Sequence, residues 1–187
     1  MNSTEGLGMN VLADMLTALR FMLLPIILYV GVLYGPDKGL ATVAGLTILA
    51  WVSDVLDGPL ARHAKRSTRL GDYDLVADVG LALALVICLV VWGALPFLLV
   101  VGGVVFTGLG VRKLQLMLPL QLAMTLAYVS FVLTAWHLAP EWGRTLTRSG
   151  GVLMLLNPPR IRRGIRRSLE QVRDLSDRIK IMLRWTK

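Results

Sequence analysis

Apolar residues in this chain gather in long runs that are separated by short polar segments. Clear runs cover residues 15–34, 40–60 and 114–138, and a longer run covers residues 75–109. An α-helix needs about 20 consecutive apolar residues to cross the hydrocarbon core of a bilayer. The longest run exceeds that length, and the glycine and proline of "WGALP", residues 92–96, predict a tight turn that divides it into two helices. The pattern therefore predicts five transmembrane helices.

The composition agrees with a membrane protein. Hydrophobic residues make up 55% of the 187 residues, and charged residues make up 17%. Soluble domains carry about 25% charged residues, so this chain is too apolar for that class. Its length is that of a single domain. We therefore expect an all-α integral membrane protein.

Positively charged residues gather in two of the predicted loops. They are Arg62, Lys65, Arg66 and Arg69 after the second run, and Arg112 and Lys113 after the fourth. Cytoplasmic loops carry an excess of lysine and arginine. We therefore expect these loops and the N-terminus to face the cytoplasm, most simply in a prokaryotic cytoplasmic membrane.

The C-terminal tail conflicts with a count of five spans. Residues 160–187 hold ten basic and three acidic residues, and five spans would place them outside, against the positive-inside rule. A sixth span would return the tail to the cytoplasm. The candidate is segment 143–159, whose strongly apolar part is Val152–Leu156. We favour a short, protein-buried sixth segment, so that residues 1–158 form a bundle of five clear helices and one short helix.

The tail itself, residues 159–187, has the pattern of an amphipathic helix. Apolar residues recur there every three or four positions, at Ile161, Ile165, Leu169, Val172, Leu175, Ile179 and Met182. A basic cytoplasmic helix lying on anionic lipid headgroups fits this pattern best. A coiled-coil seam is an alternative. Nucleic acid is the least favoured partner, because few aromatic residues interleave with the basic ones, and we expect none.

Acidic residues are concentrated in one short stretch between two apolar runs. Five of the twelve acidic residues of the chain lie within residues 53–78. One helical face carries, at positions i, i+3, i+4 and i+7, the residues Asp54, Asp57, Gly58 and Ala61. Asp74 and Asp78 are one turn apart on the next helix. If the two helices pack side by side, four carboxylates meet.

Four carboxylates at this spacing favour a bound cation. Like charges that lie close together repel one another, and a divalent ion relieves that repulsion. A cluster made of oxygen ligands suits a hard ion such as Mg²⁺, Mn²⁺ or Ca²⁺ rather than zinc. The basic residues of the following loop could hold an anion at its mouth. The alternative is that these acids pair with arginines for packing or are solvated, but charged groups at membrane depth are usually functional.

These residues resemble the signature of the CDP-alcohol phosphatidyltransferase family. In order they read Asp54-x2-Asp57-Gly58-x2-Ala61-Arg62-x8-Gly71, followed by Asp74-x3-Asp78. "TALRFMLLP", residues 17–25, is also similar to the start of the family's first membrane helix, and the resemblance covers residues 13–113.

Two features depart from the family's pattern. Two residues rather than three separate Gly71 from Asp74, and one of them, Asp72, is itself a candidate for the site. In addition, Pro59 is expected to kink the helix, because it removes a backbone hydrogen bond.

The resemblance implies a reaction. A CDP-linked lipid such as CDP-diacylglycerol gives its phosphatidyl group to an alcohol, and CMP leaves. It implies that the metal ligands are Asp54, Asp57, Asp74 and Asp78, with Asp78 also acting as the catalytic base. It implies that the residues beside the CDP-lipid are Asp54, Gly58, Ala61, Arg62 and Gly71. Residues 1–158 would then be the catalytic domain.

The acceptor alcohol is suggested by one loop. "RSTRLG", residues 66–71, looks like the corresponding loop of phosphatidylglycerophosphate and cardiolipin synthases. Glycerol 3-phosphate is therefore the first candidate acceptor. The candidates for contacting it are Arg66, Thr68, Arg112 and Lys113, although the last two are equally well explained as charges that set orientation. We also expect a homodimer.

Two other functions stay open from the sequence. Carboxylates among membrane helices could line a cation transporter or channel. However, the acids cluster near one membrane face, and the later spans carry no matching acids. An inactive family member that acts as an assembly partner is the second alternative. Arg20, in the first span, is interpreted mainly as a residue that snorkels or pairs with Asp14.

Overall fold

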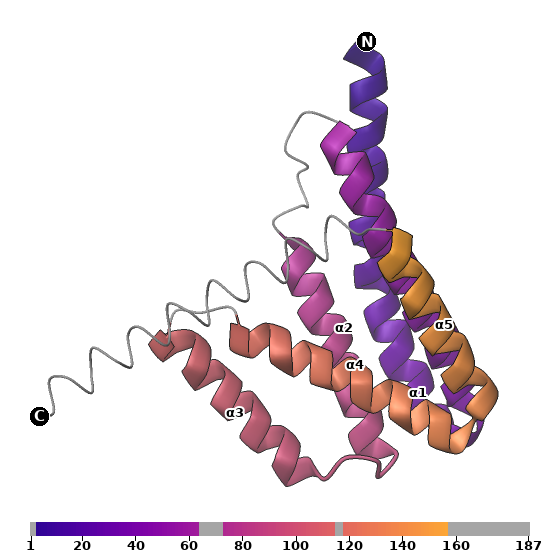
Figure 1. The fold of residues 1–187 in the computed structure, drawn as a ribbon, viewed down its shortest axis with the longest axis vertical. Coiled ribbons are helices and arrows are strands. Elements are labelled where there is room, and N and C mark those ends of the chain that lie inside the picture. The colour runs from indigo at the N-terminus through magenta and orange to yellow at the C-terminus, as the bar shows by residue number, and fades with distance from the viewer. Residues whose placement is uncertain (1–2, 64–72, 115–117, 157–187) are drawn as a thin grey trace, which may run out of the picture.

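Five helices make up the described part of the chain. The structure is a computed structural model that describes residues 3–63, 73–114 and 118–156. Its helices are α1 Ser3–His63, α2 Asp74–Val91, α3 Phe97–Leu114, α4 Leu118–Leu138 and α5 Pro140–Leu156 (Figure 1). These described ranges contain no strand, which confirms the predicted all-α class.

Helix α1 is two helices joined at a reversal. Gly35 has a φ of 63° and a ψ of −171°, which is not helical, and a residue without a Cβ adopts that positive φ at little cost. The chain turns back there, so that the first half of α1, residues 3–34, lies beside the second half, residues 36–63 (Figure 1). The reversal falls between the predicted runs 15–34 and 40–60, which are therefore separate helices.

The turn predicted at residues 92–96 is also present. Gly93 has a φ of 71°, and its amide donates a hydrogen bond of 3.0 Å to the carbonyl of Val90. The amide of Ala94 donates to the carbonyl of Leu89 at 2.9 Å. These bonds end α2 and allow α3 to start at Phe97, so the long apolar run is divided as predicted.

Helix α2 packs closely against α1 and α4. Leu85 and Cys88 of α2 are fully buried with Ile27 and Phe131. A Cβ at Gly31 would lie 2.3 Å from the Sγ atom of Cys88, so glycine is needed for the two helices to approach this closely. This packing places the start of α2 beside α1.

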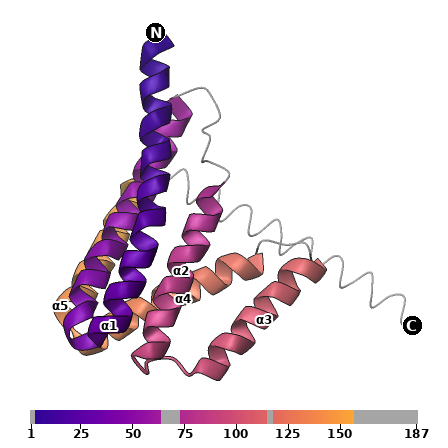
Figure 2. The ribbon, with the colours of Figure 1, turned by 180° about the vertical axis from the view of Figure 1, so that it is seen from behind.

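The predicted sixth segment, residues 143–159, corresponds to helix α5, which packs against the rest of the bundle through one face. Helix α5 lies along the second half of α1 and packs against α4 (Figures 1 and 2). A Cβ at Gly143 would lie 2.6 Å from the Cα of Trp136, and Leu146 is fully buried. Leu155 is 82% exposed, however. The segment is therefore covered by protein on one side only, and the expectation that it is buried within the protein is wrong.

The outer surface of the bundle is apolar. Three segments of the described chain are long and apolar enough to cross a membrane: Asp14–Leu56, which contains the Gly35 reversal, Asp74–Val91 and Leu118–Leu138. Phe97–Arg112 is a shorter apolar helix on the far side of α4 from α1 (Figure 2). Exposed apolar patches of this extent are stable against lipid and not against water. The protein is therefore an integral membrane protein, while the tail, residues 159–187, lies outside the described residues.

Candidate active site

Three of the predicted carboxylates meet where α1 and α2 pack. Asp54 comes from the second half of α1, and Asp74 and Asp78 come from the first two turns of α2. One carboxylate oxygen from each residue lies within 4.8 Å of the other two. The partial positive charge at the N-terminus of α2 favours carboxylates there. The side chains remain 24–34% exposed, so the described helices do not enclose them completely.

Other predicted site residues lie on the same helix as Asp54. Asp57, Gly58, Ala61 and Arg62 belong to the last two turns of α1, but their side chains lie outside the described part. The helix continues past Pro59 to His63, so this proline does not end it.

The remaining candidates for substrate contact lie either outside the described residues or on α3. Gly71, Arg66 and Thr68 lie in segment 64–72, which is outside the described residues. Arg112 is exposed near the end of α3, and Lys113 follows it on the same helix. Among the described residues, the ion pairs of the three aspartates are made with Arg20 and not with Arg112.

Arg20 occupies the centre of the carboxylate cluster. Its guanidinium Nη1 donates hydrogen bonds to Oδ1 of Asp54 at 3.2 Å and to Oδ1 of Asp78 at 3.1 Å. Its Nη2 donates to Oδ1 of Asp74. The side chain is 2% exposed, so the first of its two predicted roles, snorkelling to the interface, is wrong. Pairing with Asp14 stays a prediction.

The reversal at Gly35 explains this placement of Arg20. It returns the second half of α1 alongside the first, so that residues 34 positions apart come into contact. The sequence did indicate that Arg20 has a charged partner, because a charged residue within a membrane span is rarely left without one. Its partners could not be identified without knowing how the two halves pack.

The net charge of the cluster fits a divalent cation. Three carboxylates and one guanidinium leave a net charge of −2. The oxygen atoms are hard ligands of the kind that Mg²⁺ and Mn²⁺ prefer. A buried or half-buried excess of like charge is costly unless a counter-ion is present. The carboxylates of Asp54, Asp74 and Asp78 could therefore hold a divalent metal.

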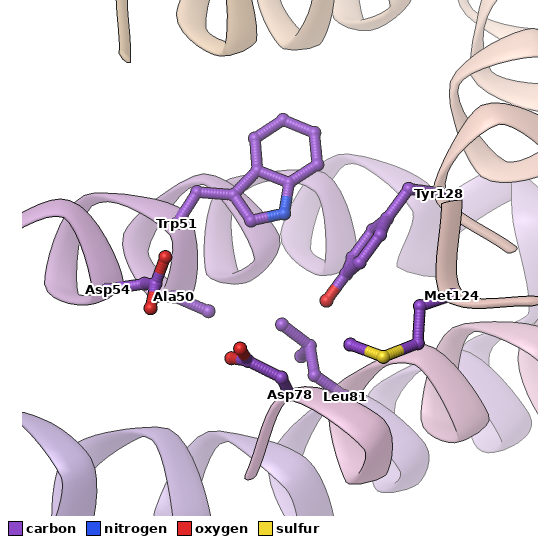
Figure 3. Close-up of a pocket in the computed structure, with 7 residues that line it drawn as sticks. All are labelled: Ala50, Trp51, Asp54, Asp78, Leu81, Met124 and Tyr128. Atoms are coloured by element: carbon purple, nitrogen blue, oxygen red, sulfur yellow. The ribbon is translucent and has the colours of Figure 1, made fainter. Parts of the chain in front are cut away.

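A small cavity adjoins the cluster. It has a volume of about 120 Å³ and is lined by Ala50, Trp51, Asp54, Asp78, Leu81, Met124 and Tyr128 (Figure 3). Helices α1, α2 and α4 all contribute to it.

The aromatic wall of this cavity is made by two helices. The ring of Tyr128 contacts Trp51 edge-on, with centroids 5.7 Å apart and planes at 68°. Figure 3 shows the hydroxyl of Tyr128 pointing into the space in front of Asp78. Sequence reasoning missed Tyr128 and Met124, because an uncharged residue in an apolar run gives no signal that it faces a site.

The fold and this site define a class: an integral membrane helical bundle with an acidic cluster suited to a divalent metal. The model of one family, described as CDP-alcohol phosphatidyltransferase, matches residues 10–156. The chain therefore belongs to the CDP-alcohol phosphatidyltransferase family, and the match includes the carboxylates, helices α2 to α5 and α1 from residue 10 onward. No curated protein and no solved structure matched the chain.

Family membership sets the broad chemistry. It supports transfer of a phosphatidyl group from a CDP-linked donor to an alcohol acceptor within the membrane. Members of the family are typically dependent on a divalent metal, which agrees with the charge of the cluster.

Proposed function

We propose that this protein transfers the phosphatidyl group of CDP-diacylglycerol to a hydroxyl of a small polar acceptor and releases CMP. The observation that carries the proposal is the convergence of Asp54, Asp74 and Asp78 beside a cavity, in a chain of this family. The acceptor oxygen forms a bond to the phosphorus that carries diacylglycerol. The pyrophosphate P–O bond breaks, and CMP leaves with the electron pair.

The four signature aspartates divide between binding and chemistry. Asp54, Asp57 and Asp74 would hold the divalent cation, Mg²⁺ or Mn²⁺, and Asp78 would complete the set. A cation bound there would neutralise charge on the pyrophosphate and on the leaving CMP. Asp78 is also the proposed base that takes the proton of the acceptor hydroxyl. Asp78 lines the cavity, which supports this role.

The two substrates would approach from different sides. The CDP-lipid headgroup would lie along Gly58, Ala61 and Arg62 at the end of α1, near Gly71. Its acyl chains would lie against the apolar outer surface, where many side chains of the described helices are exposed. The cavity beside Asp78 is small and has a tyrosine hydroxyl, which suits a polar acceptor and excludes an acyl chain.

Glycerol 3-phosphate is the proposed acceptor. The basis is the loop 66–71 and the basic residues that could contact a phosphate, Arg66, Thr68, Arg112 and Lys113. The loop that joins α1 to α2 is rich in arginine and lysine, which supports a site near the cytoplasmic face of a prokaryotic membrane. We also propose that the protein works as a homodimer.

An acceptor screen tests this proposal. The purified protein would be mixed with CDP-diacylglycerol, Mg²⁺ and, in turn, glycerol 3-phosphate, phosphatidylglycerol, inositol 1-phosphate and serine. We expect CMP release with glycerol 3-phosphate, and mass spectrometry should identify phosphatidylglycerophosphate as the lipid product. CMP release with another alcohol would correct the acceptor and keep the reaction. No CMP with any acceptor would favour an inactive assembly partner, and ion flux in vesicles would favour a channel.

A further inference from the structure

Arg20 holds the three carboxylates from their buried side. The guanidinium group contacts one oxygen of each of Asp54, Asp74 and Asp78, and its side chain is 2% exposed while theirs are 24–34% exposed. A guanidinium presents five donors in a rigid plane, so one arginine can bridge several carboxylates that a point charge could not. The guanidinium group of Arg20 therefore supplies one positive charge to the carboxylate cluster.

We propose that Arg20 is a positioning residue that keeps these three carboxylates together when no divalent cation is bound, and that a divalent cation competes with it. The inference rests on the metal centre of the proposed function. Without Arg20 the carboxylates would carry a net charge of −3 at close range, and they would repel one another.

The same geometry implies a cost in metal affinity. The three residues that Arg20 contacts are the three whose oxygens converge as candidate metal ligands. A cation entering this cluster meets a net charge of −2 rather than −3, and it meets carboxylates that already have a partner. Removal of Arg20 should therefore destabilise the metal-free protein and strengthen metal binding at the same time. Removal of a residue that only filled space would lower the stability of the protein without strengthening its metal binding.

Arg20→Met, which keeps much of the side-chain volume, tests this coupling. The full-length protein in detergent micelles would be titrated with Mn²⁺, and free Mn²⁺ would be followed by electron paramagnetic resonance. We expect the variant to bind Mn²⁺ about tenfold more tightly or better, since a neighbouring positive charge is gone. Its melting temperature in chelator should fall by about 5 °C or more, and Mn²⁺ should raise it by more than in the native protein.

Matched variants separate charge from packing. Arg148→Met removes an exposed arginine of α5 and should change neither quantity. Arg20→Lys keeps the charge without the bridging geometry, so its Mn²⁺ affinity should lie between the native protein and Arg20→Met. If Arg20→Met does not fold in chelator, either purification in Mn²⁺ or the added change Asp74→Asn, which restores the net charge of −2, should recover it. Failure of both would reject the inference.

The readouts also separate this inference from the function on which it rests. A native protein that binds Mn²⁺, with an Arg20→Met variant that binds it equally or more weakly, would overturn the role of Arg20 alone. A native protein that binds no Mn²⁺ would reject the metal centre of the proposed function, and with it the competition. Neither measurement depends on turnover.

Discussion

Asp78 is part of the carboxylate cluster around Arg20 and also part of the cavity wall. One of its oxygens accepts a hydrogen bond from Arg20, and the side chain also lines the cavity between α1, α2 and α4. Asp54 shares both features. Asp74 contacts Arg20 but does not line the cavity, which supports a role in holding the cation rather than in contacting the acceptor.

The proposed base gives a test at a single residue. Asp78→Asn keeps the shape of the side chain but cannot accept the proton, so turnover should fall by about 10²–10⁴-fold. Binding of the CDP-lipid and of Mn²⁺ should persist to a substantial degree, as equilibrium titration would show. Asp37→Asn, an exposed aspartate near the reversal of α1, is the matched control and should leave turnover unchanged. Near-normal turnover in Asp78→Asn would mean that another group takes the proton.

The cavity gives a second test at residue scale. Met124→Trp should fill the space beside Asp78, so the KM for the acceptor should rise about tenfold or more while the KM for the CDP-lipid changes little. Leu126→Trp adds the same ring two residues away on α4, at a side chain that is 66% exposed on the outer surface. That control should behave like the native enzyme. Equal KM values for the acceptor in both variants would place the acceptor elsewhere.

At the scale of elements, the reversal at Gly35 brings Arg20 to Asp54. Gly35→Ala would force a Cβ into a positive φ, which costs roughly 1–2 kcal/mol. Gly45→Ala is the matched change within the second half of α1, where the added Cβ meets open space, and it should be neutral or stabilising. Thermal unfolding in detergent compares the two. Equal melting temperatures would show that the turn tolerates another backbone geometry.

Most helices could be predicted from the apolar runs, and the site could be predicted only in part. The runs and the glycine–proline turn at residues 92–96 locate α2, α3 and α4, since membrane helices need a fixed length of apolar sequence. Helical periodicity placed Asp74 and Asp78 one turn apart on one helix, so they were expected to meet Asp54 if the two helices packed side by side. Arg20 and Tyr128 depend on which helices pack together, which is a property of tertiary structure.

At the scale of the whole molecule, the described bundle holds a cluster of three carboxylates and a buried arginine at one place between its helices, and many apolar side chains are exposed on its outside. The cluster lies where the end of α1 meets the start of α2, and α4 closes the cavity beside it. Among the described helices, α3 packs mainly against α4, so a broad apolar surface of α3 is left exposed. That surface is available to lipid or to a second copy of the chain.

The basic tail remains a prediction that belongs to this scale. Each lysine or arginine near an anionic surface contributes about 1 kcal/mol, and salt weakens that attraction. A peptide of residues 160–187 should therefore be largely unstructured in water and helical on anionic vesicles, with binding that falls at high salt. Circular dichroism with and without vesicles checks this. Helicity that rises with peptide concentration and ignores lipid would favour a coiled coil instead.

The central claim is that the carboxylate cluster uses a divalent cation to transfer a phosphatidyl group from a CDP-linked lipid. The most direct measurement is CMP release by the purified protein from CDP-diacylglycerol and glycerol 3-phosphate, in excess chelator and after Mg²⁺ or Mn²⁺ is restored. We predict that release stops in chelator and returns with either ion, because the pyrophosphate charge is then neutralised again. Full CMP release in excess chelator would contradict the account.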